Sequence, residues 1–300
     1  MHSIIKTALS KAVDWQLIAV NPVPRKGPRK CRPEFPIWTA AQIRLALDNM
    51  DHELLHLVIH LAFLTSARVG EICGLTWDCV DFEAKTILIN KTLQRAEKEA
   101  IDTLSSDGII KVFPQQEGQT KTSLILKKPK TRTSVRTLYI SDELEKELSI
   151  RFEQIAKEKV YFGDNREDFN LVFAQESGFP LEPRIVGKWF RKWQDDNSHL
   201  NLPYLRFHDI RHSSCTFKLA VSGGDIKSVQ GDTGHANATT LLNIYGHTQD
   251  KRRKALSAET SRQFYSGQDA ENDTDTDNIV DLIKNNTDLQ RKVISALISN

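Results

Sequence analysis

Apolar residues recur at helical spacing over several stretches of this chain, each bounded by a cap or a break. Thr39 precedes a helix expected to run to residue 50, and a more apolar helix is expected over residues 52–64. Asp142 and Asp225 are the predicted caps of two later helices. The same spacing predicts further helices over residues 142–160, 183–194, 206–222, 225–231 and 250–264.

The periodicity changes to two in the middle of the chain. Strands are predicted over residues 86–89, 124–126 and 135–140, and we expect them to form one small antiparallel sheet. Residues 127–134 would then be a basic hairpin tip between the last two strands. Residues 95–120 are polar and are predicted to be an inserted ribbon or loop. The predicted fold class is mainly α with a small antiparallel β-sheet (α+β).

The two ends of the chain differ from its middle. Residues 4–18 predict one helix, and the proline-rich, basic stretch 22–36 predicts an extended linker able to lie along a phosphate backbone. Residues 267–277 are an acidic linker, followed by apolar residues at helical spacing up to residue 297. Such a stripe needs a partner, either this domain or a neighbouring subunit. We predict that it docks in trans.

Composition and charge narrow the function classes. The chain has 300 residues, 39% of them hydrophobic, with no apolar run long enough to cross a bilayer and no secretory signal, which predicts a cytoplasmic protein without a membrane partner. Its four cysteines form no CxxC pair, so zinc and disulfides are not expected. Of the net charge of +2, residues 266–300 carry −4. The remaining +6 fits a polyanionic partner.

Six polar residues at the starts of predicted elements suggest phosphate chemistry: Arg68, Lys130, His208, Arg211, His235 and Tyr245. A guanidinium matches phosphate oxygens bidentately, so two arginines on different elements could hold both nonbridging oxygens of a phosphodiester. The Tyr245 phenol could attack phosphorus if a base such as His208 takes its proton. Neither a carboxylate cluster with metal spacing nor an ATP-binding glycine loop is apparent, so no cofactor is predicted.

Four motifs in this order resemble a known family. They are Thr65-Ser66-Ala67-Arg68-Val69-Gly70-Glu71, Pro129-Lys130-Thr131, His208-Asp209-Ile210-Arg211, and Gly234-His235 with Tyr245 ten residues on. The chain from about residue 39 to 264 thereby resembles the catalytic domain of the tyrosine recombinases, the integrases of phages and conjugative transposons.

The resemblance implies DNA cleavage through a 3′-phosphotyrosyl intermediate on Tyr245, without metal or ATP. It implies these roles: transition-state stabilisation by Arg68 and Arg211, general acid Lys130, general base His208, phosphate donor His235, and Glu71 as an orienting neighbour. DNA contacts are expected from Lys127, Lys128, Arg132 and Arg136. It further implies a homotetramer on double-stranded element ends and target DNA, an excisionase partner, and association with a bacterial nucleoid.

Two features depart from the family pattern. Asp232-Thr233 replaces the usual apolar pair before Gly-His, which we expect to loosen that turn. Only one helix precedes the catalytic region, so we divide the chain into residues 1–21 (last helix of a core-binding domain), 22–38 (basic linker), 39–265 (catalytic domain) and 266–300 (acidic linker and C-terminal helix). We interpret it as truncated, which predicts poor DNA cleavage or binding.

Two other functions remain open from the sequence. A type IB topoisomerase would share the chemistry but would relax supercoils without a specific site. A DNA-binding module without catalysis would have the same basic surface, although the complete set of catalytic residue types argues against it.

Overall fold

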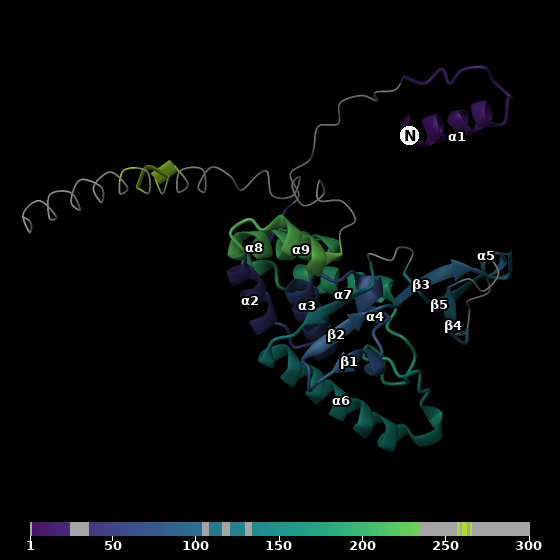
Figure 1. Cartoon of the computed structure of the whole chain (residues 1–300). Coiled ribbons are helices and arrows are strands. Elements are labelled where there is room, and N and C mark those ends of the chain that lie inside the picture. The colour runs from purple at the N-terminus through teal and green to yellow at the C-terminus, as the bar shows by residue number, and fades with distance from the viewer. Residues whose placement is uncertain are drawn as a thin grey trace, which may run out of the picture. The chain divides into compact units, whose positions relative to one another are not determined.

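The computed structural model describes residues 2–24, 36–103, 108–115, 121–129 and 134–234, together with 257–258, 260–262 and 265 (Figure 1). Lys130, Arg132, His235, Tyr245 and the predicted C-terminal helix lie outside these residues. The chain divides into two compact units, one up to Pro36 and one from Ile37 onward. No helix among the described residues is both long and apolar enough to span a membrane.

The first unit contains α1 (His2–Asp14), which ends four residues earlier than the periodicity suggested. The chain turns at Gln16, whose φ of 60° is left-handed, and the Asn21 side chain folds back to donate to Lys6 O (3.0 Å) and Ser10 Oγ (2.8 Å). This local turn stops the helix before its apolar spacing ends.

The helices α2 (Ala40–Asp48) and α3 (Glu53–Thr65) open the second unit as predicted. Thr39 caps α2 in a reciprocal capping box with Gln42, and the His52 side chain accepts from Leu55 N (3.3 Å) at the start of α3. Because α2, α6, α7 and α8 all pack against α3, it is buried on most of its sides. This central position explains why its sequence is more apolar than that of α2.

The other helices in the described part of the second unit are α4 (Val69–Cys73), α5 (Lys98–Thr103), α6 (Asp142–Phe162), α7 (Pro183–Asp196), α8 (Phe207–Val221) and α9 (Ile226–Thr233), with short 3-10 turns at Trp77–Cys79, Gly163–Asn165 and Ser198–Leu200. The last four agree with the predicted helices, whereas α5 lies in the stretch predicted to be a ribbon or loop. Two details of α6 were predicted wrongly. Ser141, not Asp142, caps it. Phe152, which the helical spacing of apolar residues places on the same stripe as the buried Leu144 and Leu148, is exposed, with its ring edge-on to Trp77.

The strands form two antiparallel sheets, not the single sheet predicted. The first, called here the inner sheet, has the order β1 (Val80–Asp81), β2 (Thr86–Ile89), β6 (Arg136–Tyr139), with Ile87 opposite Leu138. The second, called the outer sheet, has the order β3 (Thr92–Glu97), β5 (Thr122–Lys127), β4 (Ile109–Val112). Because β5 and β6 lie in different sheets, the predicted hairpin between them is wrong.

Residues within the predicted insertion 95–120 supply the missing partners of β5. The stretch includes the end of β3, the helix α5 and the strand β4, so it builds much of the second sheet. This sheet is anchored to α4 at two glycines. A Cβ atom on Gly70 would lie 2.9 Å from Leu93 O, and one on Gly74 would lie 2.8 Å from Leu93 N. The backbones of α4 and β3 therefore approach too closely for any side chain between them.

Candidate active site

Arg68 lies at the N-cap position of α4, where a single carboxylate holds both its backbone and its side chain. The backbone N–H of Arg68 donates to Glu71 Oε2 (2.9 Å), and its Nη1 donates to Glu71 Oε1 (2.7 Å). The Arg68 side chain is 40% exposed, whereas that of Glu71 is 5% exposed. One part of the guanidinium is thus fixed and another part faces solvent.

Glu71 also binds a second arginine. Arg136 Nη2 donates to Glu71 Oε2 at 3.0 Å, in a buried pair. Burial alone would raise the pKa of Glu71, but the charge and hydrogen bonds of Arg136, together with those of Arg68, more than offset it, and the pKa is lowered. The carboxylate is therefore ionised at neutral pH and bridges Arg68 and Arg136.

The position of Arg136 differs from the one expected from the sequence. We predicted a DNA contact from it, near a basic hairpin tip, but it starts a strand of the inner sheet and its side chain is buried. It also donates to the carbonyls of Asp232 (3.0 Å) and Ser134 (3.1 Å). A guanidinium with these three acceptors points into the protein, so the expected DNA contact is corrected to an internal one.

Helix α8 begins with the same local arrangement as α4. The backbone N–H of Arg206 donates to Asp209 Oδ2 (2.9 Å), and its guanidinium binds both oxygens of this buried carboxylate. Burial alone would raise the pKa of Asp209, yet the bonds from Arg206 lower it. The sequence interpretation missed Asp209. Its signal was an acid three residues after the arginine that opens a helix, which is half of a capping box.

Arg211 bonds both to the segment before Arg68 and to the end of α9. It is buried on α8 and donates to the carbonyl of Ser66, two residues before Arg68, and to Thr233 O (2.8 Å) at the end of α9. Burial and the neighbouring Arg68 lower the pKa of Arg211. The structure thus brings the two predicted arginines together from separate helices.

His208 lies one turn before Arg211 on α8, and its side chain is exposed to solvent. Desolvation by the neighbouring protein and the charge of Arg211 lower its pKa, so the imidazole is neutral at pH 7 and keeps a lone pair for a proton. Its ring packs edge-on against His212, with centroids 5.1 Å apart. The pKa of His212 is also lowered, by burial and by His208.

The end of α9 makes polar contacts with α8. Thr233 is fully buried, and the Asp232 carboxylate forms an ion pair with Lys218 on α8, which lies beside α9 (Figure 1). Gly234, with φ +65°, closes the helix by donating from its N–H to Gln230 O (2.9 Å). The polar pair therefore connects α9 to α8. Since His235 lies outside the described residues, the expected loosening of the turn stays a prediction.

Two of the other predicted DNA-binding residues lie on the outer sheet. Lys127 is the last residue of β5, and the exposed Lys128 follows it, with its backbone N–H bonded to Gly108 O (2.7 Å). Both therefore belong to the sheet formed with the insertion and not to the sheet of Arg136.

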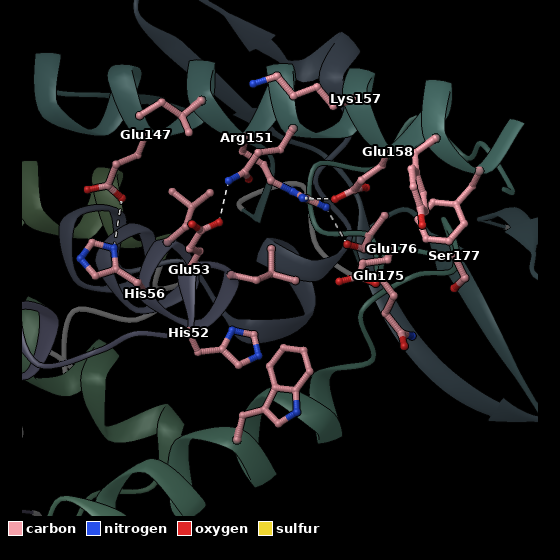
Figure 2. A pocket seen from close by; sticks show the side chains of 18 of the residues that line it. His52, Glu53, His56, Glu147, Arg151, Lys157, Glu158, Gln175, Glu176 and Ser177 are labelled. Atoms are coloured by element: carbon pink, nitrogen blue, oxygen red, sulfur yellow. Dashed lines mark hydrogen bonds and ion pairs between the residues drawn. The ribbon is translucent and has the colours of Figure 1, made fainter.

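A cavity of about 1130 Å³ opens at the other end of α3, between the start of that helix, α6 and residues 174–177 (Figure 2). Four carboxylates line it (Glu53, Glu147, Glu158 and Glu176), against two basic side chains that carry a full charge (Arg151 and Lys157). Glu147 binds His56 (3.5 Å) and His60 (2.8 Å), and Arg151 binds Glu158 (2.7 Å). The length of α3 separates this cavity from Ser66 by about 20 Å. Because carboxylates outnumber lysine and arginine in this cavity, it does not suit a phosphate, and we regard the arginine cluster as the candidate site.

Comparison with known proteins agrees with this choice. Residues 38–252 match the Phage integrase family. The chain is 28% identical over 265 residues to a XerC-like tyrosine recombinase of Caldanaerobacter subterraneus subsp. tengcongensis, and 24% identical over 259 residues to the ICEBs1 integrase of Bacillus subtilis. Each alignment covers 84% of this chain, and the chain spans 62% of the length of each relative.

Solved structures show the same fold. The integrase of transposon Tn1549, solved in complex with transposon right end DNA, has a TM-score of 0.64 at 22% identity, covering 85% of this chain and 76% of that one. The XerA recombinase has a TM-score of 0.52 at 16% identity, covering 76% and 66%. The predicted fold class and the resemblance inferred from the four motifs are confirmed. The chain therefore belongs to the phage integrase family of tyrosine recombinases.

Proposed function

We propose that this chain carries the catalytic domain of a site-specific DNA recombinase that integrates or excises a mobile element. The observation that carries the proposal is the meeting of Arg68 and Arg211, from α4 and α8, with Glu71 ionised behind Arg68. Its similarity to the ICEBs1 integrase and to the DNA-bound Tn1549 integrase supports a mobile element and a DNA substrate.

The proposed reaction is a transesterification, in which one phosphoester bond replaces another. The Tyr245 oxygen attacks phosphorus, the bond from phosphorus to the 5′ oxygen breaks, and a 3′-phosphotyrosyl link and a free 5′ hydroxyl result. His208 accepts the phenol proton, since its lowered pKa keeps it neutral. Lys130 gives a proton to the leaving 5′ oxygen, and His235 donates to the phosphate. In the reverse reaction, a second 5′ hydroxyl attacks the phosphotyrosyl phosphorus, releases Tyr245 and rejoins the strand.

Charge on the phosphate oxygens builds during this attack, and fixed cations stabilise it most when they need not reorganise. Arg68 and Arg211 fit this task, because Glu71 and the Ser66 and Thr233 carbonyls hold part of each guanidinium. The covalent link retains the energy of the phosphodiester. We therefore propose that the reaction uses neither metal nor ATP.

The assembly follows from this function. We propose that the catalytic domain spans residues 39–265, that residues 1–21 are the last helix of a core-binding domain, and that the basic linker 22–38 follows the DNA backbone. Element ends and target DNA would be held by a tetramer in a bacterial nucleoid, with residues 266–300 docked in trans and an excisionase directing excision. Lys127, Lys128 and Arg132 would contact phosphates.

The test is covalent trapping. The chain is incubated with a nicked suicide duplex carrying the end of its own element, and the DNA adduct is mapped by mass spectrometry. We expect an adduct on Tyr245 that Tyr245→Phe abolishes and that Tyr204→Phe, at an exposed phenol, leaves unchanged. A chain that binds the duplex without an adduct would be a DNA-binding module. Adduct formation on any supercoiled plasmid, with relaxation, would indicate a topoisomerase instead.

A further inference from the structure

We infer that Arg136 is a positioning residue that holds together the separate segments carrying the reactive groups, an inference that rests on the proposed function. Its guanidinium is the only group among the described residues bonded to both Glu71 and the end of α9. The residue would thus fix the geometry of the site without touching DNA.

Three donors of Arg136 reach three different segments. Nη2 donates to Glu71 Oε2 (3.0 Å), Nε to Asp232 O (3.0 Å) and Nη1 to Ser134 O (3.1 Å). The side chain also packs on the turn after α9, because a Cβ added to Gly234 would lie 3.1 Å from its Cδ and Nη1. The three nitrogens of the guanidinium each donate to a different acceptor, and a lysine, which has a single side-chain nitrogen, cannot reproduce this geometry.

Each of these segments leads to a group of the proposed reaction. Glu71 holds Arg68, Ser134 follows Lys130 by four residues, and Asp232 precedes His235 by three. Loss of Arg136 would therefore release three parts of the site at once, although none of them is close to the others in sequence.

The electrostatics of Glu71 depend on the same arginine. Glu71 is buried, and burial of a carboxylate favours its neutral form. Arg136 is the largest stabilising influence on its ionised form. Without Arg136 the carboxylate would keep only Arg68 as a charged partner within hydrogen-bonding distance, and the Asp232 carbonyl would lose a donor.

Arg151 offers a matched control. It too is a buried arginine, and it donates to two backbone carbonyls, Val172 O (3.2 Å) and Ala174 O (2.7 Å), and to one carboxylate, Glu158 (2.7 Å). It lies on α6 beside the cavity at the other end of α3, as Figure 2 shows. Replacement by lysine at either position removes a buried three-way contact, but only one of the two is at the site.

The first experiment needs no DNA. Backbone hydrogen exchange is measured on folded Arg136→Lys and Arg151→Lys chains. We expect Arg136→Lys to speed exchange in both residues 68–74 and 226–234, and Arg151→Lys to speed it only around residues 172–174. Faster exchange in one of the two site segments alone, or the same pattern in both variants, would overturn the inference. This readout stands even if the wild-type chain forms no adduct and the proposed function fails.

The second experiment separates positioning from binding. With the suicide duplex, we expect Arg136→Lys to lower the single-turnover rate of adduct formation about 10- to 100-fold, as displaced reactive groups do, while the dissociation constant for DNA changes less than about twofold. Arg151→Lys should keep the rate. A loss of DNA affinity equal to the loss of rate would show a direct DNA contact and contradict a positioning role.

Discussion

Two regions of this molecule contain the same arrangement of charges, a carboxylate between two arginines. In the site, Glu71 lies between Arg68 (2.7 Å) and Arg136 (3.0 Å). At the other end of α3, Glu158 lies between Arg151 (2.7 Å) and Arg166 (2.8 Å). Residue types and distances alone do not distinguish the two regions.

Their surroundings do distinguish them. The Arg151 and Arg166 side chains are only 8% and 2% exposed, and their further hydrogen bonds go to backbone carbonyls. Neither arginine of this ion bridge is therefore accessible to a ligand in solvent. In the site, Arg68 remains 40% exposed, and a third arginine, Arg211, adds positive charge. A buried ion bridge supports structure when its donors are all turned inward. It becomes a binding site when one fixed cation still faces solvent.

The largest effect should come from truncating one arginine in each bridge. Arg68→Ala removes a fixed cation from the phosphate and should lower the adduct rate by about 10²–10³-fold, with less than about 1 kcal/mol lost in stability because the side chain is partly exposed. Arg151→Ala removes a buried guanidinium, leaves the carbonyls of Val172 and Ala174 without this donor, and should cost about 3–5 kcal/mol. Single-turnover kinetics and urea unfolding measure the two quantities.

If the two ion bridges differ in this way, Arg68→Ala should lose activity but little stability, and Arg151→Ala should lose stability but not activity. At a temperature where Arg151→Ala is still folded, it should form adduct at the wild-type rate. If Arg68→Ala is destabilised as much as Arg151→Ala, or if Arg151→Ala is as inactive as Arg68→Ala, the two bridges do not differ in the way described.

A smaller effect concerns pH. Desolvation and the positive charge of Arg211 lower the pKa of His208, so the neutral base persists below the ordinary histidine pKa of about 6.5. The adduct rate at subsaturating DNA, which reports the free enzyme, should therefore stay level as pH falls to about 6.5 and decline only below it. An acid limb centred at or above 6.5 would contradict this assignment of the base.

The lowered pKa of His208 also affects stability. A histidine paired with an acid stabilises the fold when it is protonated, whereas protonation of His208 destabilises it. Because the folded chain binds the His208 proton less readily than the unfolded chain, acidification through the unfolded pKa destabilises the folded state. His208→Gln should lessen this loss in urea unfolding between pH 7 and pH 5.5.

The smallest effect is expected at the turn after α9. Asp232→Asn removes the partly exposed ion pair with Lys218 and should cost about 1 kcal/mol in urea unfolding, with the adduct rate changed less than about threefold. Asp142→Asn, in a more exposed pair with Lys85, is the control and should cost less. A tenfold loss of rate in Asp232→Asn would mean that this ion pair, and not Arg136 and Arg211, sets the turn.

Local signals in the sequence predicted the helices well. Thr39 and Asp225 were identified as caps because a cap depends on neighbours within three residues. The pairing of β5 was missed, because alternation predicts a strand but not its partner, and the partners came from an insertion expected to be a loop.

The site was predictable in its residue types but not in its internal bonds. Arg68 and Arg211 could be identified from their motifs, whereas the burial of Arg136 depends on Glu71, which is 65 positions away in the chain. The ion pair between Asp232 and Lys218 was likewise not predicted, because the two residues lie on different helices and 14 positions apart in the chain. Such long-range pairs arise only when the helices are packed.

Two glycines of α4, Gly70 and Gly74, hold that helix in close backbone contact with β3 of the outer sheet. Since Gly70 and Gly74 leave no space for a methyl group against Leu93, α4 cannot slide or tilt on β3 without a collision. Anything that pulls on β4 or β5 is transmitted through β3 to the helix that begins at Arg68. The outer sheet is thus rigidly coupled to Arg68, and under the proposed function a contact made by a neighbouring molecule at its edge would reach an arginine that we assign to the phosphate.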